Sequence, residues 1–313
     1  MRAIRMSGNA AARNLSYRLK QQRYLQAMAI PGVIWMLIFI YLPLVFVVIA
    51  FKEYSVAKPF WTGQWVGLKN FAEFFTDPRF AIVMKNTIGI NFFRVLLGFP
   101  IPIIFAVLLS EIRSVNYKRL VQTVAYLPHF LSWVILGGII MAWLSDVGIV
   151  NDILLRMGVI SEPVAFMAEP HYFWPIVIIS DIWKETGWSS IIYLAAIAGI
   201  DSEMYEAAIV DGAGRWHRIW NITLPSIKGT ILVLFILTMG YLLNSNFDQI
   251  FVLRNSLNVD ASDVLDIYVY RMGIVTGRYS FATAIGLFRS VISLLLLWAT
   301  NLASRKLSDT SLF

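Results

Sequence analysis

The chain has 313 residues with 58% hydrophobic and 14% charged side chains, a net charge of +7 and no cysteine. Soluble domains carry about a quarter charged residues, so the composition excludes an ordinary soluble fold, and the absence of cysteine excludes disulfides and thiolate metal sites. The basic residues flank apolar blocks, which fits membrane topology better than nucleic-acid binding, and the three histidines lack metal-ligand spacing.

Six apolar blocks are long enough to cross a bilayer, which takes about 20 residues each. Prolines inside the first two blocks are tolerable, because neighbouring groups in a membrane protein satisfy the freed backbone. We therefore predict an all-α membrane protein with a basic tail at residues 1–28, a transmembrane domain at 29–303 and a second tail at 304–313. The predicted spans are residues 30–51, 87–110, 120–145, 173–199, 229–251 and 281–303.

The basic residues predict the orientation of these spans. Residues 1–28 hold six basic side chains and no acidic one. The apolar block after them has no small-residue cleavage site, so we interpret it as a retained span and not as a signal peptide. With six spans both termini share one side, which carries 14 Lys and Arg against 9 on the other. The positive-inside rule then places both termini in the cytoplasm.

Two segments predicted on the outer side are amphipathic. Aromatic residues follow the first span and fit a stretch at the bilayer surface, where amphipathic rings settle. A second segment has an apolar and a polar face. The first stretch holds Trp61, Trp65 and Phe71; the second has Ile149, Ile153, Leu154 and Met157 on its apolar face and Asn151, Asp152 and Arg156 opposite.

The predicted cytoplasmic loop at residues 201–228 differs from the other connections. Asp201 is a suitable helix N-cap, and Gly212 or Gly214 can end this helix with a left-handed backbone. A second short helix is expected to stop near Pro225. The small residues of the loop let a partner approach the backbone closely, although an ordinary solvated hairpin could have the same composition.

The spacing of this loop resembles the EAA signature of ABC importer permeases. Glu206-Ala207-Ala208 is followed by Gly212 and then by Ile222-Thr223-Leu224-Pro225. The resemblance implies the MetI-like fold of type I importers, in which this loop forms a coupling helix that sits in a cleft of a cytoplasmic ATPase. It also implies that Glu206 pairs with a basic ATPase residue and that Gly212 sets the turn. The residues assigned to ATPase coupling are Glu206, Ala207, Ala208, Gly212, Ala213, Ile222, Leu224 and Pro225.

Other stretches resemble carbohydrate permeases, and the resemblance covers nearly the whole chain from residue 30. Residues 65–71 look like the motif after the first span of that family. Residues 126–130, 148–151 and 193–196 are similar to permeases for oligosaccharides and polysaccharide fragments. The implied function is import of such carbohydrate, for example alginate- or pectin-derived fragments, across a bacterial plasma membrane.

The resemblance also implies partners: a dimer of cytoplasmic ATPases that binds ATP and Mg, a second homologous permease, and an extracytoplasmic solute-binding protein. The chain has no G-x-x-x-x-G-K-[ST] motif, so ATP hydrolysis is expected in the partner. No catalytic residue, metal or cofactor is expected in this chain.

Charged residues inside spans indicate where a substrate could pass, because each costs about 2.5–3.5 kcal/mol at the centre of a helix. Arg94 and Arg289 would suit acidic fragments, but they could equally snorkel or pair with carboxylates for structure. Asp181 and Glu185 share one helix face, and Lys184 could reach Asp181 across a turn as a structural pair. For the asparagines at the end of the fifth predicted span, hydrogen bonding between helices is an equal alternative to sugar binding. The path candidates are Tyr241, Asn244, Asn246, Asp248, Gln249, Arg289, Arg94 and Trp188.

Two other functions are compatible with a multi-span chain. One is an ABC importer permease for a non-sugar solute, against which the carbohydrate-type stretches argue. The other is an intramembrane enzyme, which would need a nucleophile with its base, or clustered carboxylates and histidines at membrane depth. His129 has no evident partner in the sequence for that role.

Overall fold

The structure is a computed structural model that describes residues 21–57, 59 and 62–307. Most of the predicted basic tail, Trp61 and the C-terminal tail from residue 308 lie outside the described residues. The first half of the chain forms α2 (Arg23–Met36), η1 (Leu37–Tyr41), α3 (Leu42–Leu44), η2 (Val45–Phe51), β1 (Lys52–Glu53), β2 (Gln64–Trp65), α4 (Lys69–Thr76), α5 (Phe80–Phe93), η4 (Arg94–Gly98), α6 (Pro100–Ser110), α7 (Val115–Tyr126), η5 (Leu127–Phe130), α8 (Trp133–Trp143) and α9 (Ile149–Arg156). The second half forms α10 (Pro170–Ala198), α11 (Ser202–Val210), α12 (Arg215–Arg218), η6 (Ile219–Thr223), α13 (Leu224–Gly240), α14 (Phe247–Leu253), α15 (Val259–Ser262), α16 (Leu265–Tyr270), η7 (Arg271–Val275) and α17 (Tyr279–Leu307).

Four helical segments of the described chain are long and apolar enough to cross a membrane: Arg23–Phe51, Phe80–Ser110, Arg215–Gly240 and Tyr279–Arg305. A bent pair, Val115–Phe130 and Trp133–Trp143, would make a fifth. Helix α10 has 29 residues, which is sufficient length, but it carries three charged side chains in its middle. The described residues therefore give four to five candidate spans by length and composition, and the predicted count of six is not confirmed.

The third predicted span, at residues 120–145, is not one straight helix. The chain bends by 100° between Phe130 and Trp133. Pro128 lies in the short helix η5 before the bend, where its missing N–H disfavours a continued α-helix. Ser132 then starts α8 as an N-cap, because its hydroxyl accepts a hydrogen bond from the Ile135 amide at 3.3 Å. The two local signals together produce the bend.

Three prolines lie within continuous helical segments and do not end them. A widened π-helical turn lies just before Pro43, Pro100 and Pro225, formed by η1, η4 and η6 respectively. A proline inside an α-helix removes one N–H and clashes with the carbonyl four residues earlier. A π-turn changes that register locally and relieves the conflict. The helices around these prolines consequently remain continuous.

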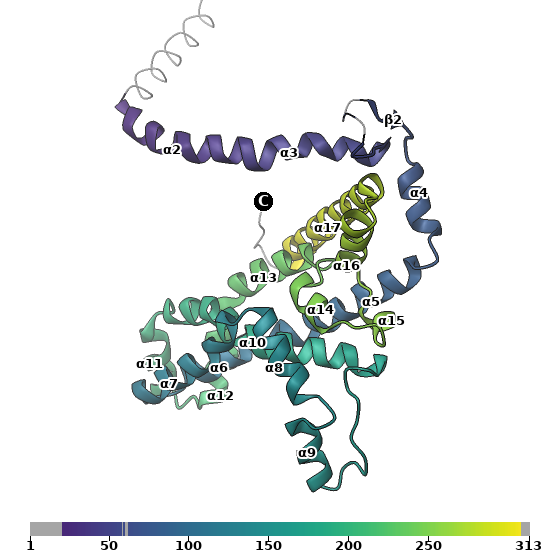
Figure 1. The fold of residues 1–313 in the computed structure, drawn as a ribbon. Helices are drawn as coiled ribbons and strands as arrows, with labels where there is room; N and C mark the ends of the chain where they lie inside the picture. The colour runs from purple at the N-terminus through teal and green to yellow at the C-terminus, as the bar shows by residue number, and fades with distance from the viewer. Residues whose placement is uncertain (1–20, 58, 60–61, 308–313) are drawn as a thin grey trace, which may run out of the picture.

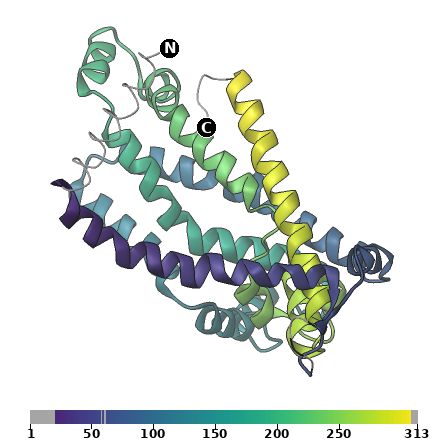
Figure 2. The same cartoon turned by 90° about the horizontal axis from the view of Figure 1, so that it is seen from above.

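The first long helix, from α2 to η2, stands apart from the rest of the chain. Figure 1 shows it separated from the other helices along most of its length and meeting them beside α17 at its C-terminal end. Ala50 is its one fully buried hydrophobic residue within the described chain. Figure 2 shows the same helix crossing the molecule when seen from above. Its apolar surface is therefore left for lipid or for another protein.

The remaining helices pack around two hydrophobic clusters. The larger cluster joins α5, α8, α10 and α14 through residues such as Leu136, Val177 and Ile250, which have no exposed surface. The smaller one joins α4, α16 and α17 around Phe74 and Tyr268. Burial raises the pKa of Tyr268, and its hydroxyl donates a hydrogen bond to Asp77 Oδ2 at 2.7 Å. This cluster fixes the end of the molecule opposite α11 and α12 (Figure 1).

Helix α9 is amphipathic as predicted, with Ile149 and Ile153 exposed and an Asp152–Arg156 ion pair of 2.9 Å. Asn151, however, is not on a solvated face. It is fully buried, and its amide group bonds the backbone N–H and C=O of Val164 at 2.9 and 3.0 Å. The Asn151 side chain therefore ties α9 to the segment at Val164 and does not face water.

Candidate functional site

Helix α11, in the loop predicted to couple to an ATPase, begins and ends with well-defined caps. The Asp201 carboxylate accepts a hydrogen bond from the Glu203 amide at 3.0 Å and so caps α11. At the other end Gly212 has a left-handed backbone with φ of 79°. Its amide bonds the Ile209 carbonyl at 3.0 Å, and the Ala213 amide bonds the Ala208 carbonyl at 2.8 Å. These two bonds form a Schellman cap, which requires a left-handed residue at this position.

The outer surface of α11 is open. Glu206, Ala207 and Ile209 are exposed, and 87% of Val210 is accessible, whereas Tyr205 and Ala208 are partly buried. The other residues assigned to coupling are distributed along the same loop. Gly212 and Pro225 are exposed, and Ala213, Ile222 and Leu224 are partly buried. In Figure 1 the loop lies at the opposite end of the molecule from α4 and α15.

The return arm of this loop, which is the helical segment from Arg215 onward, does not end where it was predicted to end. The helix that starts at Arg215 does not stop near Pro225, because α12, η6 and α13 run on to Gly240 as one span. The π-turn of η6 before Pro225 removes the reason to stop. The loop is therefore linked directly to a membrane helix.

That membrane helix ends in a break that opens onto a cavity. The predicted fifth span at 229–251 is wrong as one helix, because residues 241–246 are not helical and Asn246 has φ of 48°. Non-helical backbone at membrane depth is tolerated where it is buried in protein or lines a cavity. Here Tyr241, Asn244 and Asn246 line a cavity of 680 Å³ together with residues of η4, α6 and α10.

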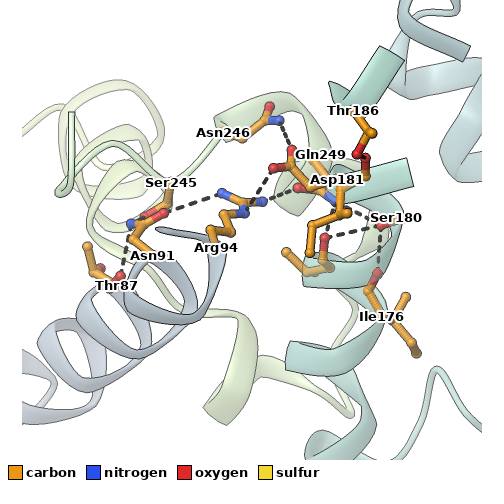
Figure 3. A network of polar contacts seen from close by, with 12 residues as sticks. Thr87, Asn91, Arg94, Ile176, Ser180, Asp181, Thr186, Ser245, Asn246 and Gln249 are labelled. Carbon is orange, nitrogen blue, oxygen red and sulfur yellow. Dashed lines mark hydrogen bonds and ion pairs between the residues drawn. The ribbon is translucent and has the colours of Figure 1, made fainter. Parts of the chain in front are cut away.

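A polar network holds the wall of this cavity together (Figure 3). The Arg94 guanidinium lies 3.5 Å from Asp181 Oδ2, and it donates hydrogen bonds to Gln249 Oε1 and, at 3.4 Å, to Asn91 Oδ1. Asp181 also accepts a hydrogen bond from the Asn246 side chain at 3.1 Å. The network thus joins η4 and α5 to α10, to Asn246 at the end of the break and to α14 after it.

Gln249 extends the network into α10. It is fully buried, and its amide donates to the Val177 carbonyl at 2.8 Å and to Ser180 Oγ at 2.9 Å. The Arg94 and Asp181 side chains are 11% and 21% exposed. Because both charges are largely buried, each depends on the other for compensation.

Glu185 and Trp188 of α10 form another part of the wall, and both contact His129 of η5. His129 Nδ1 lies 2.8 Å from Glu185 Oε2, and the His129 ring stacks on Trp188 with centroids 4.4 Å apart. His129 therefore has partners that the sequence did not reveal. The predicted Lys184–Asp181 pair is wrong: the Lys184 ammonium lies 3.5 Å from Glu185 Oε1 and donates to the His129 carbonyl at 2.5 Å.

The structure brings together five of the eight predicted path residues, while Gln249 lies behind them. Asp248 and Arg289 do not line the cavity. Arg289 is paired with Asp266, whose other oxygen accepts from the Ser245 amide at 2.7 Å. The path residues that line the cavity are Arg94, Trp188, Tyr241, Asn244 and Asn246.

Two polar residues of this site, Asn91 and Ser180, were not predicted. Asn91 is one helical turn before Arg94, and this spacing was the available signal. Within the described residues, no three His, Asp or Glu side chains gather into a group that could hold a metal ion.

Comparison with known proteins decides the family. Residues 98–309, about two thirds of the chain, match the family described as binding-protein-dependent transport system inner membrane component. The chain belongs to this family. As permeases of ABC transport systems, its members are membrane subunits and not themselves enzymes.

The permease is similar along most of its length to curated proteins of Bacillus subtilis strain 168. It is 44% identical to Protein LplB over 296 residues, covering 94% of this chain and 92% of LplB. It is 39% identical to the polygalacturonan/rhamnogalacturonan transport system permease protein YteP over 302 residues, covering 96% and 94%.

A solved structure has the same fold. A chain of a bacterial ABC transporter that imports the acidic polysaccharide alginate matches with a TM-score of 0.86 and 39% identity, over 94% of this permease and 99% of that chain. A second structure of a bacterial alginate ABC transporter, in complex with a periplasmic protein that holds an alginate pentasaccharide, matches with a TM-score of 0.87 and 39% identity, covering 95% and 99%.

Proposed function

We propose that this permease passes carbohydrate, as oligosaccharides or polysaccharide fragments, into the bacterial cytoplasm as one subunit of an ATP-driven importer. The cavity at the break after α13 is the observation that carries the proposal. Its lining combines an aromatic face at Trp188 with the amides of Asn244 and Asn246. Aromatic rings stack on pyranose rings and amides bond hydroxyls, so the lining suits a sugar. The similarity to polysaccharide transport permeases supports the same cargo.

The proposed topology has six spans. Four are the long apolar segments, the bent pair α7–η5 and α8 is another, and α10 is the sixth. Helix α10 can carry its three charges because Asp181 and Lys184 have partners inside the protein and Glu185 faces the cavity. Both termini and the α11–α12 loop then lie in the cytoplasm, where basic residues are enriched.

The proposed partners follow from this topology. The open face of α11 fits a cleft in a cytoplasmic ATPase dimer, which would bind ATP and Mg. The apolar surface of the segment Arg23–Phe51 fits a second permease packed along it. An extracytoplasmic binding protein would dock at the end that carries α4 and α15. Closure of the ATPase pair would move the loop and open the spans outward, and ATP hydrolysis would return them.

Arg94 and Arg289, which suggested an acidic fragment, do not select the charge of the transported carbohydrate. Arg94 is paired with Asp181, and Arg289 is paired with Asp266. Each guanidinium already has a carboxylate partner in the protein, so neither is a free cation for a uronate. Discrimination between neutral and acidic fragments must depend on other groups, including those of the second permease.

Charge removal at Glu206 tests the proposed coupling. In vesicles containing the complete transporter, Glu206→Gln is expected to lower carbohydrate uptake and substrate-stimulated ATP hydrolysis by about tenfold, because it removes a charge-assisted contact worth about 1.5–3 kcal/mol. The assay follows uptake of a graded set of neutral and acidic oligosaccharides together with phosphate release.

Glu203→Gln is the matched control, since Glu203 is exposed in the first turn of the same helix. It is expected to retain most of the uptake. Equal activity of the two variants would refute the role of Glu206, and uptake of amino acids or phosphate in place of every oligosaccharide would refute the cargo.

A further inference from the structure

The docking helix α11 is attached to the membrane helices on either side through short non-helical links. Residues 199–201 separate it from α10, and residues 211–214 separate it from α12. The second link contains Gly212 with its left-handed backbone and Gly214, and a Cβ at either glycine would meet no atom within 4 Å. Because these links are open, they do not fix the direction in which α11 transmits a displacement. Side-chain contacts set that direction.

One side-chain hydrogen bond joins α11 to the return arm within the described part of the chain. The hydroxyl groups of Tyr205 and Thr223 lie 2.9 Å apart. Thr223 is 2% exposed and Tyr205 is partly buried, so water competes little for this bond. Among the described residues no ion pair involves α11, and no side-chain hydrogen bond joins it to α10.

The position of Thr223 links this bond to the cavity. Thr223 is the last residue of η6, and α13 begins at the next residue. Helix α13 runs without interruption to Gly240, and the cavity-lining break follows at residues 241–246. Leu234 and Thr238 of α13 also line the cavity. A displacement of α11 passed to Thr223 therefore reaches the cavity along one continuous helix.

We propose that Tyr205 and Thr223 are positioning residues that make α11 and α13 move together. This proposal rests on the proposed function, because it needs an ATPase that displaces α11. The bond directs the movement into α13 and the break at residues 241–246, where the path opens and closes. Without it, the ATPase still binds α11 and hydrolyses ATP, but less of each cycle moves the spans.

The test compares Tyr205→Phe, Thr223→Val and their double variant in vesicles containing the complete transporter. A hydrogen bond between neutral groups changes an equilibrium by about two- to tenfold. Each single variant is expected to lower the amount of carbohydrate taken up per ATP hydrolysed by that factor. The double variant should match the single variants, since all remove the same bond. Thr223→Ser keeps the hydroxyl and should restore the ratio.

Two controls separate this role from a merely structural one. Tyr117→Phe and Thr123→Val make the same chemical changes in α7, where Thr123 bonds its own helix at 2.9 Å, and they should leave the uptake ratio unchanged. The amount of ATPase that co-purifies should also stay constant in the Tyr205 and Thr223 variants. A loss of ATPase binding in these variants, or an unchanged uptake ratio, overturns the proposal.

The Glu206 result distinguishes the two proposals. If Glu206→Gln abolishes stimulated uptake while Tyr205→Phe and Thr223→Val behave like their α7 controls, then coupling stands and the positioning role is wrong. If Glu206→Gln has no effect, then the coupling assignment itself fails.

Discussion

Gly212→Ser is expected to lower ATP-driven uptake by about tenfold or more, whereas Gly214→Ser leaves most of it. Both glycines have open space around the position of a Cβ, so crowding cannot distinguish them. They differ in backbone: φ is 79° at Gly212 and −67° at Gly214. A side chain in the left-handed region costs roughly 1–2 kcal/mol, and relief of that strain would disrupt the Schellman cap and turn α11 away from the ATPase.

The expected order at position 212 is glycine, then asparagine, then serine, because asparagine tolerates a left-handed backbone better than most residues. At position 214 serine also suits the N-cap of α12. The measurement is carbohydrate uptake per ATP in vesicles, with co-purified ATPase as a second readout. If serine has the same effect at both positions, the left-handed turn does not matter for coupling.

Asp181→Leu is expected to destabilise the permease by about 3–5 kcal/mol, since it leaves the Arg94 guanidinium buried without its ionic partner. For a protein of this size, that corresponds to a fall in melting temperature of roughly 10 °C. The measurement is thermal unfolding of the purified transporter in detergent. Replacing both charges, as Arg94→Met with Asp181→Leu, should recover much of the loss, because it removes the uncompensated charge.

Asp152→Leu provides the control, because it breaks an exposed pair in which Arg156 and Asp152 are 79% and 52% accessible. Such pairs contribute about 0–1 kcal/mol, so the melting temperature should hardly move. A double variant at Arg94 and Asp181 that is as unstable as Asp181→Leu would show that the buried charge is not the cause.

The sequence predicted the long helices well where apolar composition alone determines them. The first, second and last spans end within a few residues of their expected ends, although the first two start about seven residues earlier than predicted, at Arg23 and Phe80. It failed where local chemistry alters a helix. The bend between Phe130 and Trp133 and the break at residues 241–246 interrupt apolar blocks that look continuous. Conversely, Pro225 suggested a helix end that a π-turn avoids.

The site was predictable in composition but not in pairing. Asparagine and aromatic residues near the end of α13 indicated a polar lining, and three of them face the cavity. The sequence could not identify the partner of Arg94, because Asp181 lies on a helix more than 80 residues away. Asp181 and Glu185 also each had a candidate partner nearby in the sequence, Lys184. Tyr205 and Thr223 similarly meet only after the chain turns at Gly212.

The most direct test of the account uses the absence of cysteine from the native chain. Val210, which is 87% exposed on α11, is replaced by cysteine and modified with a photo-crosslinker in the assembled transporter. The expected result is a product that contains the ATPase subunit. Val147→Cys, 96% exposed before α9, should give no such product and should react with a membrane-impermeant maleimide from outside. A Val210 cysteine that reacts from outside, or that never crosslinks to the ATPase, would contradict the account.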